Sequence, residues 1–279
     1  MQIEHLKKEV AAIGLGHRWQ LLEKMLGQEI RLTLQEFTDQ SISIGQSQAG
    51  GKPHVPDNFV WPTDQEQNPL DFIAQINCSA AHKFDPSGLL PKEGLISFFY
   101  SSEQPAGFDP QERDKFSVFY FEDTNSLRVA EFPENFATSF NPMHIIFSQE
   151  PSLPSIEKVN EAFNLYDNDE EFDLYATLRD VTPTHKMFGY ANEIDTDDMA
   201  LQCELIANDV YCGDTEHFEH PQIKEFETKA HDWHLLLQID SDDEAGFMWG
   251  DVGRLYFWIR KQDLSNRNFG NVWVIMQCT

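Results

Sequence analysis

The sequence predicts an α+β fold, mainly β, in one domain with an N-terminal helical segment, short peripheral helices and a three-strand unit that occurs twice. Three observations predict it. Apolar residues have helical spacing only at the start of the chain, and short runs in which apolar and polar residues alternate follow, separated by Gly and Pro. Two groups of these short runs resemble each other. The 279 residues are 41% hydrophobic and include 22 Phe and 6 Trp. This composition excludes a disordered acidic chain and requires a large core.

The N-terminal segment, residues 1–27, has the apolar spacing of an amphipathic helix. Its apolar residues recur at intervals near three, four and seven: Leu6, Val10, Ile13, Trp19, Leu22 and Leu26. Gly14 and Gly16 interrupt the run, and two glycines cost about 1–2 kcal/mol of helix propensity. We therefore expect two short helices or one kinked helix.

Short strands are expected from Ile30 onward. Ile30, Leu32 and Leu34 alternate with polar residues, and Ile42 and Ile44 alternate again. The period of two that these residues follow is typical of strands with one buried face.

Peripheral helices are expected in the second half of the chain. Ser155, after Pro154, is a suitable N-cap for a short helix. Residues 214–227 predict a polar helical excursion broken near Pro221, and the acidic run 166–173 predicts a solvated loop or helix face.

Two segments of the chain, residues 72–121 and 235–277, resemble each other. The matching runs are FIAQIN (72–77) and LLLQID (235–240), GLISFFY (94–100) and GRLYFWI (253–259), and FSVFYF (116–121) and VWVIMQ (272–277). Because the connections between the runs are also of similar length, we predict one duplicated three-strand unit inside a single domain of residues 1–279.

Polar residues occupy matching positions in the first strand of each unit. Gln75 corresponds to Gln238, and Asn77 corresponds to Asp240. Both faces of these strands are largely apolar, so an unpaired Gln amide would cost about 1–3 kcal/mol there. Two alternatives remain open: the glutamines bond main chain where the two halves meet, or they line a shared cleft and contact a ligand.

The charge balance restricts the partners. With 20 Lys and Arg against 47 Asp and Glu, the formal net charge is −27. Such a surface repels phosphate and anionic lipid, which excludes nucleic acid and membranes and favours a basic protein or a cation. The first ten residues lack the features of a secretory signal, and no later segment approaches ~18 uncharged apolar residues, so a cytoplasmic location is expected.

Several longer segments match the pattern of a known family. They are GGKPHVPDNFVWP (50–62), PLDFIAQIN (69–77), LLPKEGLISFFY (89–100), FGYANEIDTDDMALQCEL (188–205) and the C-terminal block 233–279. On these segments, which cover most of the chain, it resembles the YwqG-like family, a widespread bacterial family of unknown function. The resemblance implies a mainly β fold with helices in one domain, and no reaction. Similar members occur in settings linked with toxin systems, which suggests an immunity or partner-binding role.

The acidic loop DSDDEAGFMWGD (240–251) is a candidate cation or contact site. Its candidate ligands for a cation are Asp240, Asp242, Glu244 and Asp251. Their spacing is that of a calcium loop, but Ala245 replaces the glycine and the flanks read as strands. The alternatives are a solvated turn capped by its own carboxylates, a divalent-cation site, and a contact loop in which Trp249 anchors a partner.

No cofactor is expected, because the glycines at 50–51 do not open a helix that could hold a phosphate group. The sequence also contains no nucleophile elbow, so nucleophilic catalysis has little support. His185 precedes a glycine turn and is a candidate for a cleft, with a surface or turn histidine as the alternative.

Two functions follow from these features. The first is a non-catalytic binding protein with a basic protein partner, of which a toxin-immunity role is one form. The alternative is an enzyme or a small-ligand-binding protein that uses a cleft between the two repeats, with a ligand that the sequence does not identify.

Overall fold

The structure is a computed structural model that describes residues 3–37, 42–85, 87–134, 136, 140–179, 181–195 and 198–279. The strands are β1 (Gly27–Glu36), β2 (Gln48–Ala49), β3 (His54–Pro56), β4 (Asp71–Asn77), β5 (Leu95–Tyr100), β6 (Phe116–Phe121), β7 (Leu127–Val129), β8 (Met143–Ser152), β9 (His185–Met187), β10 (Trp233–Asp240), β11 (Arg254–Arg260) and β12 (Trp273–Gln277). The α-helices are α1 (Ile3–Ala12), α2 (Trp19–Met25), α3 (Cys78–Ala81), α4 (Ile156–Phe163), α5 (Asp169–Arg179), α6 (Met199–Ile206), α7 (Ile223–Ala230) and α8 (Lys261–Ser265). Short 3-10 helices are η1 (Gly16–Arg18), η2 (His82–Phe84), η3 (Pro110–Asp114), η4 (Leu165–Asp167), η5 (Thr215–Glu219) and η6 (Phe269–Asn271). The fold is therefore α+β and mainly β, as the sequence predicts.

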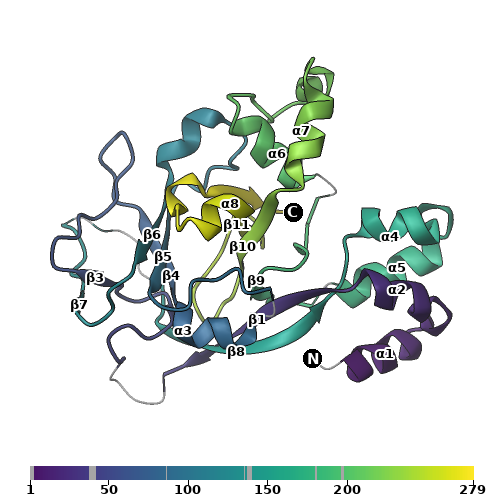
Figure 1. Ribbon diagram of the computed structural model, residues 1–279, viewed down its shortest axis with the longest axis horizontal. Helices are drawn as coiled ribbons and strands as arrows, with labels where there is room; N and C mark the ends of the chain where they lie inside the picture. Colours follow the sequence, from purple (N-terminus) through teal and green to yellow (C-terminus); the bar gives the residue numbers. More distant parts are fainter. Residues whose placement is uncertain are drawn as a thin grey trace.

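Most strands belong to one large antiparallel sheet. Its order is β12-β11-β10-β9-β1-β8-β2-β4-β5-β6, and β3 pairs with β7 in a separate small sheet. The central pair, β1 and β8, runs in register from Gly27 opposite Ser152 to Glu36 opposite Met143. Figure 1 shows this pair as a long ribbon that connects the helices near the N-terminus with the rest of the sheet.

The large sheet curves until its two ends meet, so it is nearly closed, like a barrel. Phe98 of β5 contacts Phe257 of β11 with ring centroids 5.1 Å apart, and Phe116 of β6 contacts Trp273 of β12 at 5.0 Å. The indole N–H of Trp273 also donates to the carbonyl of Gly107 at 2.8 Å. One buried apolar cluster includes side chains from both ends of the sheet, and burial of this apolar surface stabilises the curvature.

A second apolar cluster lies under the helices near the N-terminus. It joins α1, α2, α4 and α5, which Figure 1 shows grouped beside one end of the central ribbon. The chain makes two short helices here, as the glycines at positions 14 and 16 predict. Ser155 caps α4 by accepting a hydrogen bond from the Lys158 N–H, which confirms the predicted helix start.

The six strands predicted from the matching runs are all present, but the strand expected at Ile42 and Ile44 is not. Ile44 lies exposed in a turn, where Gly45 has a φ of +79° and donates its N–H to Nδ1 of His54. Two alternating residues are too short a pattern to specify a strand when a glycine turn follows directly. Within the described ranges no helix is both long and apolar enough to cross a membrane.

Candidate functional site

The two matched glutamines are fully buried and are held by main-chain groups. The amide oxygen of Gln75 accepts the His54 N–H at 2.8 Å, and its nitrogen donates to the Gln46 carbonyl at 2.7 Å. The amide oxygen of Gln238 accepts the Asn192 N–H at 2.9 Å, and its nitrogen donates to Thr184 at 2.8 Å. These bonds hold connections within each half of the sheet, so the bonding capacity of both amides is used inside the protein.

Two other candidates are also bound within the fold. Asn77 caps α3 through its Oδ1 and donates from Nδ2 to the Gly45 carbonyl at 2.7 Å. Trp249 is buried, donates its indole N–H to the carbonyl of Asp240 at 3.2 Å, and stacks on Phe247. Trp249 therefore anchors the acidic loop to the core, and it is not exposed to a partner.

Asp240 and His185 form the base of the acidic loop. The Asp240 carboxylate accepts the Thr184 N–H at 2.8 Å and lies 3.1 Å from Nε of Arg254. His185 lies in β9 and is buried, so its interpretation as a surface histidine was wrong. Its Nδ1 accepts the Asp240 N–H, and Nε2 therefore carries the proton and donates to Oδ2 of Asp242 at 3.1 Å.

The remaining carboxylates of the loop do not converge on one point. Asp242 accepts the N–H groups of Glu244 and Ala245 and thereby closes the turn, while Asp243, Glu244 and Asp251 are exposed. The hydrogen bond from His185 lowers the pKa of Asp242, and this effect outweighs partial burial, which raises it. In the described part of the chain, no group of three or more His, Cys, Asp or Glu side chains is arranged to hold a metal ion.

An acidic cleft of about 830 Å³ nevertheless opens between the acidic loop and β1. Its charged or titratable lining residues are Arg31, Glu150, His185, Asp240, Asp242, Asp243 and Glu244. Val181, Met248 and Val252 also line it and are 54%, 44% and 56% exposed. The acidic cleft thus combines an excess of negative charge with exposed apolar side chains.

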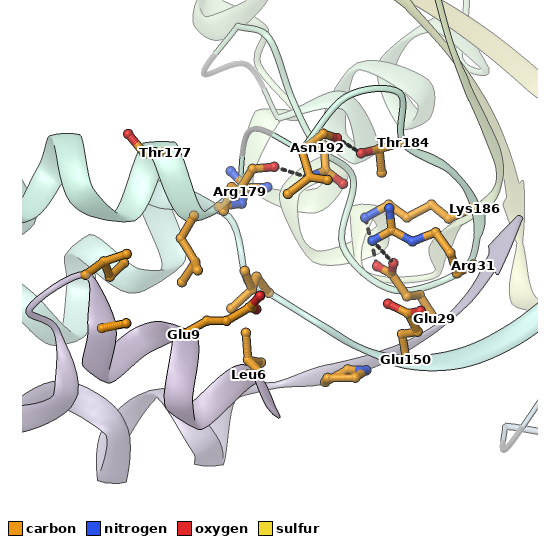
Figure 2. Close-up of a pocket in the computed structure, with 16 residues that line it drawn as sticks. Leu6, Glu9, Glu29, Arg31, Glu150, Thr177, Arg179, Thr184, Lys186 and Asn192 are labelled. Carbon is orange, nitrogen blue, oxygen red and sulfur yellow. Dashed lines mark hydrogen bonds and ion pairs between the residues drawn. The ribbon is translucent and has the colours of Figure 1, made fainter. Parts of the chain in front are cut away.

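A second cavity, of about 400 Å³, shares Arg31, Glu150 and Val181 with the acidic cleft and is called the helix cavity below. It lies between α1, α5 and the strands β1, β8 and β9 (Figure 2). On its strand wall, Oε2 of Glu29 lies 3.0 Å from Nζ of Lys186, and Oε1 lies 2.7 Å from Nη2 of Arg31. Lys186 and Glu29 are each only 2% exposed.

Burial and ion pairing act in opposite directions on this cluster. Burial raises the pKa of Glu29, but the charges of Lys186 and Arg31 outweigh it and lower the pKa overall. Burial lowers the pKa of Lys186, and the Glu29 carboxylate opposes that shift. Removal of either Glu29 or Lys186 would therefore leave the other charge buried without this partner, which is destabilising.

Sequence reasoning missed this cluster. Glu29 and Arg31 alternate with Ile30 and Leu32, which is typical of a strand side that faces solvent. Only the placement of α1 and α5 over that side makes it the wall of a cavity. The local signal was Lys186, a charged residue next to the apolar residues Met187 and Phe188.

A comparison with family models assigns the chain to a family. A family model described as a domain of unknown function, DUF1963, matches residues 47–278, so the chain belongs to that family. The search of curated proteins found no match to the chain.

Proposed function

We propose that this protein is a non-catalytic binding protein that holds a basic segment of a partner protein in the acidic cleft. The observation that carries the proposal is the lining of that cleft, where the carboxylates outnumber the single guanidinium of Arg31. Because the whole chain also carries a formal charge of −27, its field attracts a cationic partner over a distance of about 8–10 Å.

The exposed apolar residues support a peptide in preference to a small cation. Val181, Met248 and Val252 border the carboxylates. Lys and Arg side chains have long apolar stems below a charged head, so they match a surface on which apolar and acidic groups alternate. A hydrated metal ion would leave these apolar contacts unused.

Two arrangements support a binding role over catalysis for the residues beneath the cleft. His185 and Asp240 already use their polar atoms within the chain, in bonds to one another and to Thr184. They therefore position the loop, while Asp243 and Glu244 are exposed and available to a partner. The alternative, an enzyme or a small-ligand protein with a site between two repeats, is supported instead by the helix cavity, which borders the central strands β1 and β8.

The internal repeat remains part of the proposal. Register shifts occur between Phe72 and Ala74 in β4 and between Leu235 and Leu237 in β10. The carbonyl and N–H groups that bind each matched glutamine are eight residues apart in both halves: Gln46 and His54, and Thr184 and Asn192. We infer that β2-β4-β5-β6 and β9-β10-β11-β12 arose by duplication inside one domain, in a cytoplasmic protein of the YwqG-like family.

The proposal is tested by fluorescence polarisation with a labelled Lys- and Arg-rich decapeptide and an acidic decapeptide of the same length. The intact protein should bind only the basic peptide, and added salt should weaken binding. Asp243→Asn with Glu244→Gln should weaken it about 2- to 30-fold, because each of the two exposed ion pairs contributes about 0.2–1 kcal/mol.

The matched control is Glu161→Gln with Glu170→Gln, which removes the same charge from exposed positions on α4 and α5. Equal loss of binding in both double variants would show that net charge alone attracts the peptide, and would overturn the cleft as the site. The toxin-immunity form of the proposal requires that the protein protect cells from a toxin encoded beside its gene. It is abandoned if co-expression gives no protection.

A further inference from the structure

The helix cavity contains buried polar atoms that lack partners. Nε of Arg31 and Nε of Arg179 are donors without an acceptor, and Oδ1 of Asn192 is an acceptor without a donor. Arg179 is 7% exposed, and its Nη2 donates to the Ala191 carbonyl and to Glu193, both at 2.6 Å. An unsatisfied buried group costs about 1–3 kcal/mol, so a ligand that reached these atoms would gain free energy by pairing with them.

The two walls of the helix cavity differ in character. Figure 2 shows Leu6 and Glu9 on α1 and Arg179 at the end of α5, with Arg31 on the strand side. The apolar part of the lining consists of Leu6, Ala12, Ile13, Pro151, Leu153, Leu178 and Val181. A volume of about 400 Å³ that combines an apolar part with polar and charged side chains can accommodate a small molecule that has both apolar and polar groups.

We propose that the helix cavity binds a free amino acid with an aliphatic side chain. Its carboxylate accepts a hydrogen bond from Nε of Arg31 on the strand wall, and its ammonium donates to Oδ1 of Asn192. Its side chain packs against the apolar residues of α1 and α5. The amino acid thereby supplies an acceptor, a donor and an apolar body, each matched to a feature of the walls.

The charges of the cavity favour a zwitterion over a simple anion. The lining has three basic side chains, Arg31, Arg179 and Lys186, and a balancing set of acidic ones in Glu9, Glu29 and Glu150. A ligand with a carboxylate alone would be repelled by these acidic side chains, whereas the ammonium of a zwitterion is attracted to them. This inference rests on the helix cavity and is independent of the proposed binding of a basic partner.

Isothermal titration calorimetry with L-leucine on the full chain tests the proposal, together with two analogues that each lack one group. The analogues are 3-methylbutylamine, which has no carboxylate, and 4-methylpentanoate, which has no ammonium. L-leucine should bind at least tenfold more tightly than either. Equal binding of either analogue would overturn the assignment of the missing group, and no binding of L-leucine at 10 mM would overturn the proposal.

Ala12→Trp and Arg31→Lys locate the site, and Ala11→Trp is the control. Ala12→Trp fills the cavity from an exposed position on α1 and should weaken L-leucine binding at least tenfold, whereas Ala11→Trp, exposed on the same helix outside the lining, should change it less than twofold. Arg31→Lys keeps the charge beside Glu29 but removes the Nε donor, so it should weaken binding severalfold. Binding unaffected by Ala12→Trp would place the ligand elsewhere and overturn the proposal. Asp243→Asn with Glu244→Gln should leave L-leucine binding unchanged, which separates this test from that of the acidic cleft.

Discussion

Gln75 and Gln238 make equivalent pairs of hydrogen bonds in opposite halves of the sheet. Each accepts a main-chain N–H with its amide oxygen and donates its amide nitrogen to a main-chain carbonyl. Both side chains are fully buried, so each amide pairs main-chain groups that water does not reach. The two glutamines are therefore structural clamps that join a residue before and a residue after β2, and likewise before and after β9.

Gln238→Leu should lower the free energy of unfolding by about 1–3 kcal/mol, because the Asn192 N–H and the Thr184 carbonyl would lose their partner in the core. Urea denaturation followed by tryptophan fluorescence measures the change. Gln20→Leu, at an exposed position of α2, is the control and should have an effect below about 0.5 kcal/mol. A midpoint for Gln238→Leu equal to that of the control would contradict the clamp.

The buried ion pair between Glu29 and Lys186 predicts a strong dependence on both partners. Lys186→Met should cost about 3 kcal/mol, since the buried Glu29 carboxylate would lose its ammonium partner and keep only Arg31 and Ser152. The double variant Lys186→Met with Glu29→Leu should regain part of this loss, because the buried carboxylate is removed together with its ammonium partner. Urea denaturation of both variants measures this.

The exposed pair between Lys224 and Glu227 provides the comparison for the buried pair. Lys224→Met should change stability by less than about 1 kcal/mol, because water screens exposed charges. A double variant at Glu29 and Lys186 that is less stable than Lys186→Met alone would refute the interpretation of the pair.

The pH dependence of stability should carry a contribution from Asp71. Burial raises the pKa of this carboxyl to about 7 in the folded protein, well above its value of about 3.9 in an unfolded chain. The folded state therefore favours the protonated form, and the stability that Asp71 contributes is fully present below pH 4 and is lost as the pH rises to about 7.

Asp71→Asn should accordingly raise the urea midpoint at pH 8 relative to the unmodified protein and leave it nearly unchanged at pH 4. The difference between the two proteins should grow through the interval from pH 4 to 7, by about 1.4 kcal/mol for each unit of pKa shift. A difference that is the same at pH 4 and pH 8 would show that Asp71 does not titrate in this interval.

Calcium should leave the melting temperature almost unchanged. Asp240 is paired with Arg254, and Asp242 with His185 and its own turn, so the carboxylates of the loop are already neutralised, hydrogen-bonded or exposed to water. A site with a dissociation constant 100-fold below the added concentration would contribute about 2.7 kcal/mol. Differential scanning calorimetry with calcium and with EDTA makes the comparison. A large stabilisation that disappears in Asp242→Asn with Glu244→Gln would identify a metal site instead.

The sequence by itself determined the secondary structure in the regions where a pattern was long enough. The alternation in 72–77 and 235–240 predicted β4 and β10, the glycines at 14 and 16 predicted the divided helix, and Ser155 predicted the start of α4. The isolated pair Ile42 and Ile44 did not suffice. Local patterns succeed here because backbone geometry and side-chain period act over a few residues.

Only the tertiary structure decided which polar residues face a partner and which are part of the core. His185 and Asp240 line the acidic cleft and Trp249 belongs to the acidic loop, yet their polar atoms are used inside the chain. Glu29 and Lys186 are 157 residues apart and meet only because β1 pairs with β9. The sequence could indicate that a charged residue lies on a strand, but whether a helix covers that face depends on packing between distant segments, for which burial of apolar surface is the driving force.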